Sequence, residues 1–128
     1  MMKINEQMKT FANEMIALHG KGYPFHRQEI QEFLAQHFGT KPDSVIPSDY
    51  CYNRVNKDSK PLLLFLFCED GIYQCVGENF QYKKYVTAKP HGAKNEIIVG
   101  EWKDGRLIPN ENWDLCGLKK SFLIKVNK

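Results

Sequence analysis

Three polar side chains of the kinds that read base edges in DNA stand close together in the run SVIPSDYCYNRVN, at positions 44–56. Arg54 carries a fork of donors that fits the edge of guanine, and Asn53 carries a donor and an acceptor that fit adenine. Ser48 could bond a base or a phosphate oxygen. In the alternative interpretation Ser48 caps a helix and the other two are ordinary surface residues. The sequence leaves both interpretations open.

Lysines in the expected loops could add salt-dependent contacts to phosphate. They are Lys41, Lys57, Lys60, Lys83, Lys84, Lys89 and Lys94. The pair Lys83-Lys84, which precedes Tyr85, is the most suggestive of them. The 15 acidic residues of the chain support a plainer interpretation, in which these lysines only keep the protein in solution.

The same run also contains two tyrosines, Tyr50 and Tyr52. Tyr50 and Tyr52 could both stack on a base or donate to a phosphate. We expect Tyr50 to be partly buried, because alternate aromatic residues on a short helix usually include one that packs in the core.

The four cysteines and four histidines lack the spacing of a metal site. No two cysteines form a CxxC pair, so we expect buried free thiols and no bound metal. The chain has neither a Walker loop nor a Rossmann fingerprint, so we expect no nucleotide cofactor. We assign no catalytic residue.

Length and composition favour one packed domain over residues 1–128, with 42% apolar residues. A net charge of +3 permits an anionic partner without requiring one. The longest apolar run, Pro61–Cys68, is shorter than the roughly 18 residues of a membrane span. The N-terminus lacks the apolar region of a signal peptide, so we expect a cytoplasmic protein that has no contact with membranes.

Apolar residues recur at helical spacing in two early stretches. They predict amphipathic helices over Lys3–His19 and His26–Phe38, which end at Gly20 and Gly39. Tyr23-Pro24-Phe25 is expected to be a turn between them.

A short third helix is expected within Ser44–Asn56. Pro47 suits a first helical turn but pushes Ile46 away from helical angles. The helix therefore starts either at Ser44 or after a Ser48 cap. Either start places the polar side chains of the run on one or two helical turns.

Two Asp-Gly pairs predict tight hairpins. Around Asp70-Gly71 the expected partners are Glu69 with Ile72, Cys68 with Tyr73, and Leu66 with Cys75. Asp104-Gly105 is expected to join a strand at Asn95–Lys103 to Arg106-Leu107-Ile108. Further strands are expected at Tyr82–Ala88 and Ser121–Val126.

The order of helix, helix, short helix and hairpin over about residues 3–77 resembles the winged-helix-like modules of bacterial restriction-type proteins. The runs that carry this resemblance are GTKPDSVIPSDYCYNRVN and FLFCEDGIYQCVG. The resemblance implies DNA binding near restriction or phage-defence systems. We expect an α+β fold, in which an N-terminal winged-helix-like unit of three helices (3–77) has a β-hairpin wing that extends into a small antiparallel sheet (78–128).

A nuclease interpretation starts from Glu101-x-Lys103, which follows an apolar strand. This run resembles the core of metal-dependent restriction nucleases, with Asp70 as the upstream carboxylate. The resemblance implies that the two carboxylates hold Mg²⁺ and that the lysine orients the attacking water. The flanking helices of such a core are missing from the second half of the chain.

We therefore expect a non-enzymatic DNA-binding module, with Ser48, Tyr52, Asn53, Arg54, Lys57, Lys83 and Lys84 as its contacts. A homodimer is compatible with this expectation. The alternative is a protein-interaction module, such as an inhibitor or accessory subunit, and the nuclease is third. The surface separates the first two, because DNA binding predicts a basic face around Arg54. Protein binding predicts an exposed aromatic patch with Tyr52, Phe80 and Tyr82.

Overall fold

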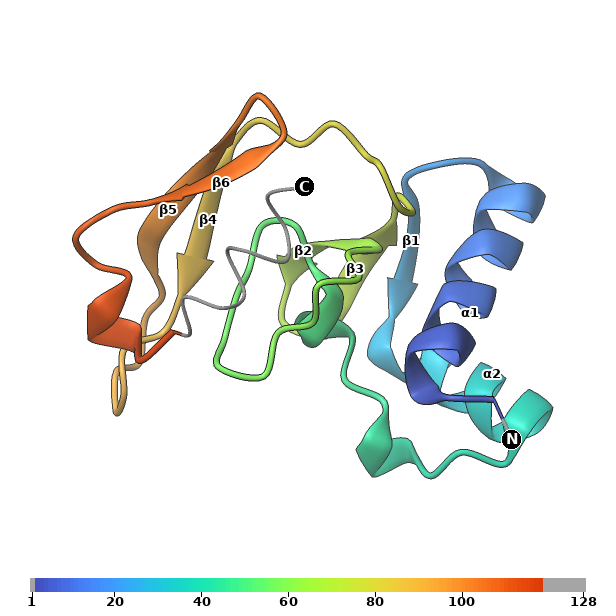
Figure 1. Cartoon of the computed structure of the whole chain (residues 1–128). Helices are drawn as coiled ribbons and strands as arrows, with labels where there is room; N and C mark the ends of the chain where they lie inside the picture. The colour runs from blue at the N-terminus through green and yellow to red at the C-terminus, as the bar shows by residue number, and fades with distance from the viewer. Residues whose placement is uncertain (1, 119–128) are drawn as a thin grey trace.

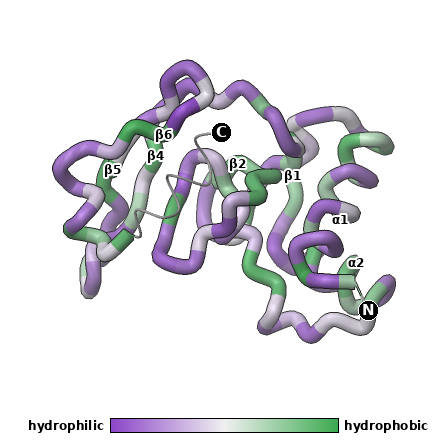
Figure 2. The backbone as a smooth tube through the Cα atoms, in the orientation of Figure 1, coloured by the Kyte–Doolittle hydropathy of each residue, from purple (hydrophilic) through white to green (hydrophobic). Residues whose placement is uncertain are grey.

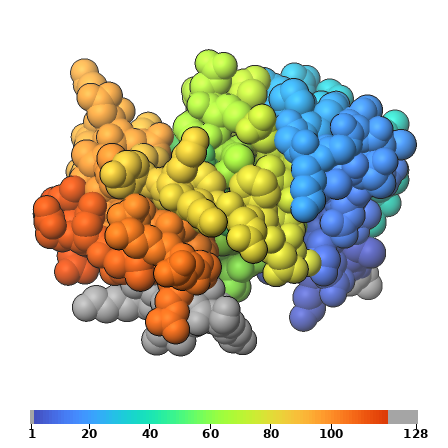
Figure 3. All heavy atoms as spheres, turned by 90° about the horizontal axis from the view of Figure 1, so that it is seen from above, coloured from blue at the N-terminus to red at the C-terminus, as the bar shows by residue number. Residues whose placement is uncertain are grey.

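A computed structural model describes residues 2–118, so the strand expected at Ser121–Val126 lies outside the described residues. The fold is α+β, as expected, with two small antiparallel sheets (Figure 1). Figure 3 shows the N-terminal helices and the C-terminal strands at opposite ends of the molecule, with the middle of the chain between them.

The two predicted helices are confirmed as α1 (Ile4–His19) and α2 (Arg27–Phe38). Hydrophobic and hydrophilic stretches alternate along α1, as an amphipathic helix requires (Figure 2). Its buried side includes Met8, Phe11, Ala12 and Met15, and that of α2 includes Ile30 and Leu34. The His26 ring accepts a hydrogen bond from the Gln28 N–H and so caps α2, which ends at Gly39 in the left-handed conformation.

The segment expected to be a turn after α1 is strand β1 (Tyr23–His26), so that prediction was wrong. β1 pairs with β3 (Ile72–Cys75), and β3 pairs with β2 (Phe65–Glu69), which gives the sheet order β1-β3-β2. Proline is typical of turns, but an edge strand also tolerates Pro24, because one side of its backbone needs no ladder partner.

The Asp70-Gly71 hairpin joins β2 to β3 as predicted, with Glu69 opposite Ile72. Beyond that pair the predicted register was wrong, because the ladder is interrupted between Phe67 and Glu69, so Cys68 has no partner in it. Leu66 therefore lies opposite Gln74. This shift brings Phe67 opposite Tyr73, and their rings meet edge to face at 5.7 Å.

The second sheet has the order β4 (Tyr85–Ala88), β5 (Ile97–Lys103), β6 (Arg106–Pro109). The Asp104-Gly105 hairpin is confirmed, with Lys103 opposite Arg106. The wing was expected to extend into this sheet, but β2 and β3 belong to a separate ladder. Gly100 fixes the approach of β6, because a Cβ there would lie 2.5 Å from the Ile108 carbonyl oxygen.

The expected third helix is absent, so the prediction for residues 44–56 was wrong. Two short 3₁₀ turns, Pro42–Ser44 and Pro47–Tyr50, are followed by extended backbone at Cys51. A helix would need the carbonyls of Asp49 and Tyr50 to accept from residues four positions later. Instead they accept from the N–H groups of Lys60 and Leu64, at 2.8 Å each.

Residues 51–55, which we call the joint, connect the two sheets. The Tyr52 N–H donates to the Phe65 carbonyl of β2, and the Val55 N–H donates to the Thr87 carbonyl of β4, each at 3.0 Å. Cys51 packs in the hydrophobic core beneath the helices, whereas Tyr52 and Val55 pack in a second core under β4–β6. The joint therefore ties two cores together.

A candidate binding pocket between the two sheets

Asn53, predicted to contact DNA, uses its side chain to close the outer edge of β2. The Phe67 N–H donates to Asn53 Oδ1, and Asn53 Nδ2 donates back to the Phe67 carbonyl, both at 2.8 Å. One side-chain amide thus replaces a residue of a neighbouring strand.

Arg54 also makes internal contacts. Its Nε lies 3.3 Å from Glu96 Oε1, and the guanidinium stands 4.2 Å from the centre of the Phe67 ring. Both side chains of the ion pair are 21% exposed. The basic face expected around this arginine is therefore neutralised at its centre.

The other predicted contacts fall in different places. Ser48 is half-buried on the turn Pro47–Tyr50, and Lys57 is exposed in the loop before β2. Lys84 is also exposed. Tyr52 and Lys83, in contrast, line the same pocket.

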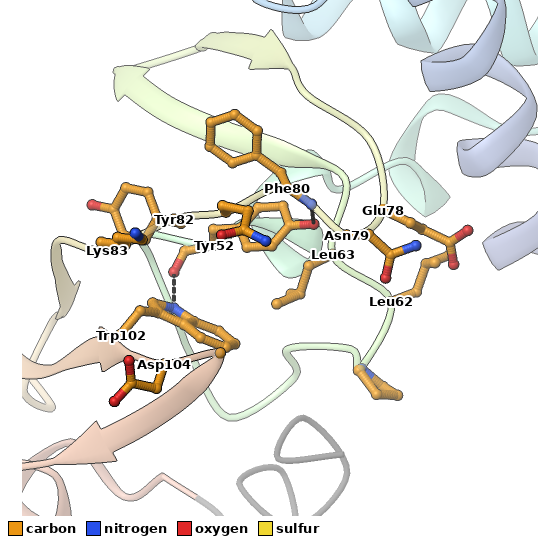
Figure 4. A pocket seen from close by; sticks show the side chains of 13 residues that line it. Tyr52, Leu62, Leu63, Glu78, Asn79, Phe80, Tyr82, Lys83, Trp102 and Asp104 are labelled. Atoms are coloured by element: carbon orange, nitrogen blue, oxygen red, sulfur yellow. Dashed lines mark hydrogen bonds between the residues drawn. The ribbon is translucent and has the colours of Figure 1, made fainter.

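This pocket has a volume of about 520 Å³ and lies between the two sheets (Figure 4). Tyr52 comes from the joint, Phe80 and Tyr82 come from the segment between β3 and β4, and Trp102 comes from β5. The remaining lining residues are Pro61, Leu62, Leu63, Glu78, Asn79, Gln81, Lys83, Asp104 and Gly105.

Tyr52 is the central ring of an aromatic cluster. The centre of its ring lies 5.7 Å from Phe80, 6.5 Å from Tyr82 and 6.1 Å from Trp102. Tyr52 and Trp102 are buried, whereas Phe80 and Tyr82 are half-buried. The two half-buried rings are therefore the walls that a ligand can reach.

The polar ends of these rings are already bonded within the protein. The Tyr52 hydroxyl donates to the Gly77 carbonyl at 2.7 Å, and burial raises its pKa. The Trp102 indole donates to the Tyr52 carbonyl at 2.8 Å, and the Tyr82 hydroxyl donates to the Tyr85 carbonyl at 2.8 Å. The cluster therefore presents ring faces and edges to the pocket.

The lining of the pocket carries more negative charge than positive charge. It includes Glu78 and Asp104 against the single cation Lys83.

The residues considered for nuclease chemistry are divided between the sheets. Asp70 lies in the turn between β2 and β3, whereas Glu101 and Lys103 lie on β5 and approach each other at 3.6 Å. Within residues 2–118 no three His, Cys, Asp or Glu side chains form a group that could hold a metal ion. Burial raises the pKa of Cys51 and takes that of Cys75 to about 12, so both thiols stay protonated at neutral pH and are poor nucleophiles.

The sequence predicted a functional role for four of the pocket residues, Tyr52, Phe80, Tyr82 and Lys83. Tyr52, Phe80 and Tyr82 were expected to form an exposed aromatic patch, but Tyr52 is buried and the other two are half-buried. Trp102 and Asp104 were missed, because no local pattern indicates that the β5–β6 hairpin packs against residues so far from it in the chain.

No helix in the described part of the chain is long and apolar enough to cross a membrane.

The uncharacterized protein YnaC of Bacillus subtilis (strain 168) is 38% identical over 104 residues, which are 80% of this chain. The chain spans only 36% of the length of YnaC. No solved structure matches. A model of the family described as Domain of unknown function (DUF7225) matches residues 3–108, which include every residue that lines the pocket. The chain belongs to this family.

Proposed function

We propose that the chain is a non-enzymatic protein-interaction module, and that the pocket between the sheets receives a side chain of the partner. The observation that carries this proposal is the meeting of Tyr52, Phe80, Tyr82 and Trp102 at one pocket. Aromatic residues are enriched where protein interfaces bury a few anchoring side chains.

The size and construction of the pocket support this proposal. A volume of about 520 Å³ falls within the range of roughly 300–1,000 Å³ that is typical of ligand sites. Its floor is held by the joint and by the hydrogen bond between Trp102 and Tyr52. A preformed floor reduces the ordering cost of binding, because few side chains must be fixed when the partner arrives.

Selection of a random displayed peptide library on the full chain tests this function. We expect enriched peptides that bind wild type and lose roughly tenfold or more in affinity with Tyr82→Leu, because that change removes a reachable wall. Tyr85→Leu is the matched control, since Tyr85 is 58% exposed and does not line the pocket. Failure to enrich any peptide, or equal losses in both variants, would refute a pocket-based interaction.

DNA binding is a second proposal, supported by the element order. The first half runs α1, β1, α2, two 3₁₀ turns, β2 and β3, with the sheet order β1-β3-β2. This order resembles that of a winged helix, with the two turns in the place of the reading helix. A role in restriction or phage defence rests on the same resemblance.

Binding of duplex DNA over a salt series, followed by fluorescence anisotropy, tests the second proposal. If Arg54 reads DNA, Arg54→Ala weakens binding and leaves the protein folded, whereas Glu96→Gln, which breaks the same ion pair, keeps binding intact. Replacing Lys83 and Lys84 by alanine should lower the salt slope by about one for each phosphate contact that is lost. Absence of binding at low salt would exclude this proposal.

A further inference from the structure

Resting on the proposed protein-interaction function, we propose that the group held in the pocket is a cation, the guanidinium of an arginine or the ammonium of a lysine on the partner. This choice follows from the ring faces, from the charge of the lining and from the Asp104 carboxylate at its edge.

The rings offer π surface in place of hydrogen-bond donors. The hydroxyls of Tyr52 and Tyr82 and the indole N–H of Trp102 all donate to backbone carbonyls of the protein. A ligand rich in carbonyl or phosphate oxygens would find none of these donors free. The face of an aromatic ring carries negative potential and attracts a cation.

The carboxylates add the matching charge. Asp104 lines the pocket and makes no ion pair within residues 2–118, and Glu78 lies 3.0 Å from the exposed Lys9 ammonium. Ion pairs this exposed contribute little, so the partner's cation can take over Glu78. Lys83 is exposed, and its long side chain can turn towards solvent. The lining therefore favours a cation over an anion.

A pair of small probes tests the charge directly. N-acetyl-arginine methylamide and its citrulline counterpart have nearly the same shape, but only arginine is charged. The chain has two tryptophans, so its indole N–H resonances report separately on Trp102, in the pocket, and on Trp113, outside it. Trp113→Phe assigns the two signals.

We expect the arginine probe to shift the Trp102 indole resonance in a saturable way and to bind roughly tenfold more tightly than citrulline. Asp104→Asn should reduce the preference for arginine. Asparagine tolerates the positive φ of 51° at this turn, so the hairpin is retained. Glu111→Gln, an exposed change outside the pocket, is the control.

Equal binding of the two probes, or an unchanged preference in Asp104→Asn, would overturn the cationic anchor. Tighter binding of a nucleotide such as dGMP would overturn it in favour of a phosphate ligand. Different results would refute the cationic anchor and the protein-interaction function. Enriched peptides that lack Arg and Lys refute the cation and keep the interaction, whereas arginine binding without any enriched peptide does the reverse.

Discussion

Leu64→Asp is expected to abolish the fold. Leu64 is fully buried beneath the helices, and its carbonyl accepts from the N–H groups of Val76 and Gly77 at 3.0 and 2.9 Å. A carboxylate at this site would lie in an apolar core, either charged or protonated, at a cost of several kcal/mol. Domains of this size are stable by about 5–15 kcal/mol, so we expect no cooperative thermal transition by near-ultraviolet circular dichroism.

Leu18→Asp is the control for this substitution. Leu18 lies on α1 but is 65% exposed, so the same chemical change there should leave the melting temperature close to that of wild type. A cooperative, unshifted melt of Leu64→Asp would contradict the central position of Leu64.

Asn53→Leu is expected to have the second largest effect, about 2–5 kcal/mol in the free energy of unfolding measured by urea denaturation. Leucine has a similar volume but cannot bond the Phe67 N–H and carbonyl, and each unsatisfied buried group costs about 1–3 kcal/mol. The loss also weakens the joint where it meets β2.

Asn13→Leu is the control, because Asn13 is exposed on α1. It should change the free energy of unfolding by no more than about 0.5 kcal/mol. An equally small effect at Asn53 would show that the side-chain amide does not hold the edge of β2.

Local signals explain which elements the sequence could predict. Periodic apolar residues place α1 and α2 to within one residue at each end, and the Asp-Gly pairs place both hairpins. These patterns depend on neighbours along the chain, and so a single sequence contains them.

The prediction of a third helix was wrong because hydrogen bonds to distant residues determine the backbone conformation of this segment. The carbonyls that would build it bond Lys60 and Leu64, and the joint then pairs with β2 and β4. Tertiary partners override weak local propensity in such a short segment. Tyr50 was expected to be partly buried and is fully so, with its hydroxyl 2.6 Å from Asn5 Oδ1 and burial raising its pKa to about 12.

In the candidate site, too, the sequence could predict the contacts between neighbours in the chain but not those between distant residues. Phe80 and Tyr82 are near neighbours in the chain, so the sequence could predict that they belong to one aromatic patch. Trp102 contacts Tyr52 because β5 packs against the joint. Arg54 is held in an ion pair by Glu96, which lies in the loop before β5. Neither contact leaves a pattern in the sequence.

The fold of the joint is tested by the backbone conformation of residues 44–56, measured by ¹³Cα and ¹³Cβ chemical shifts in solution. We predict extended values at the joint, with slow amide exchange at Tyr52 and Val55, because both N–H groups bond the sheets. Helical values from Tyr50 to Arg54, with fast exchange at Tyr52, would contradict the account and restore a reading helix for DNA.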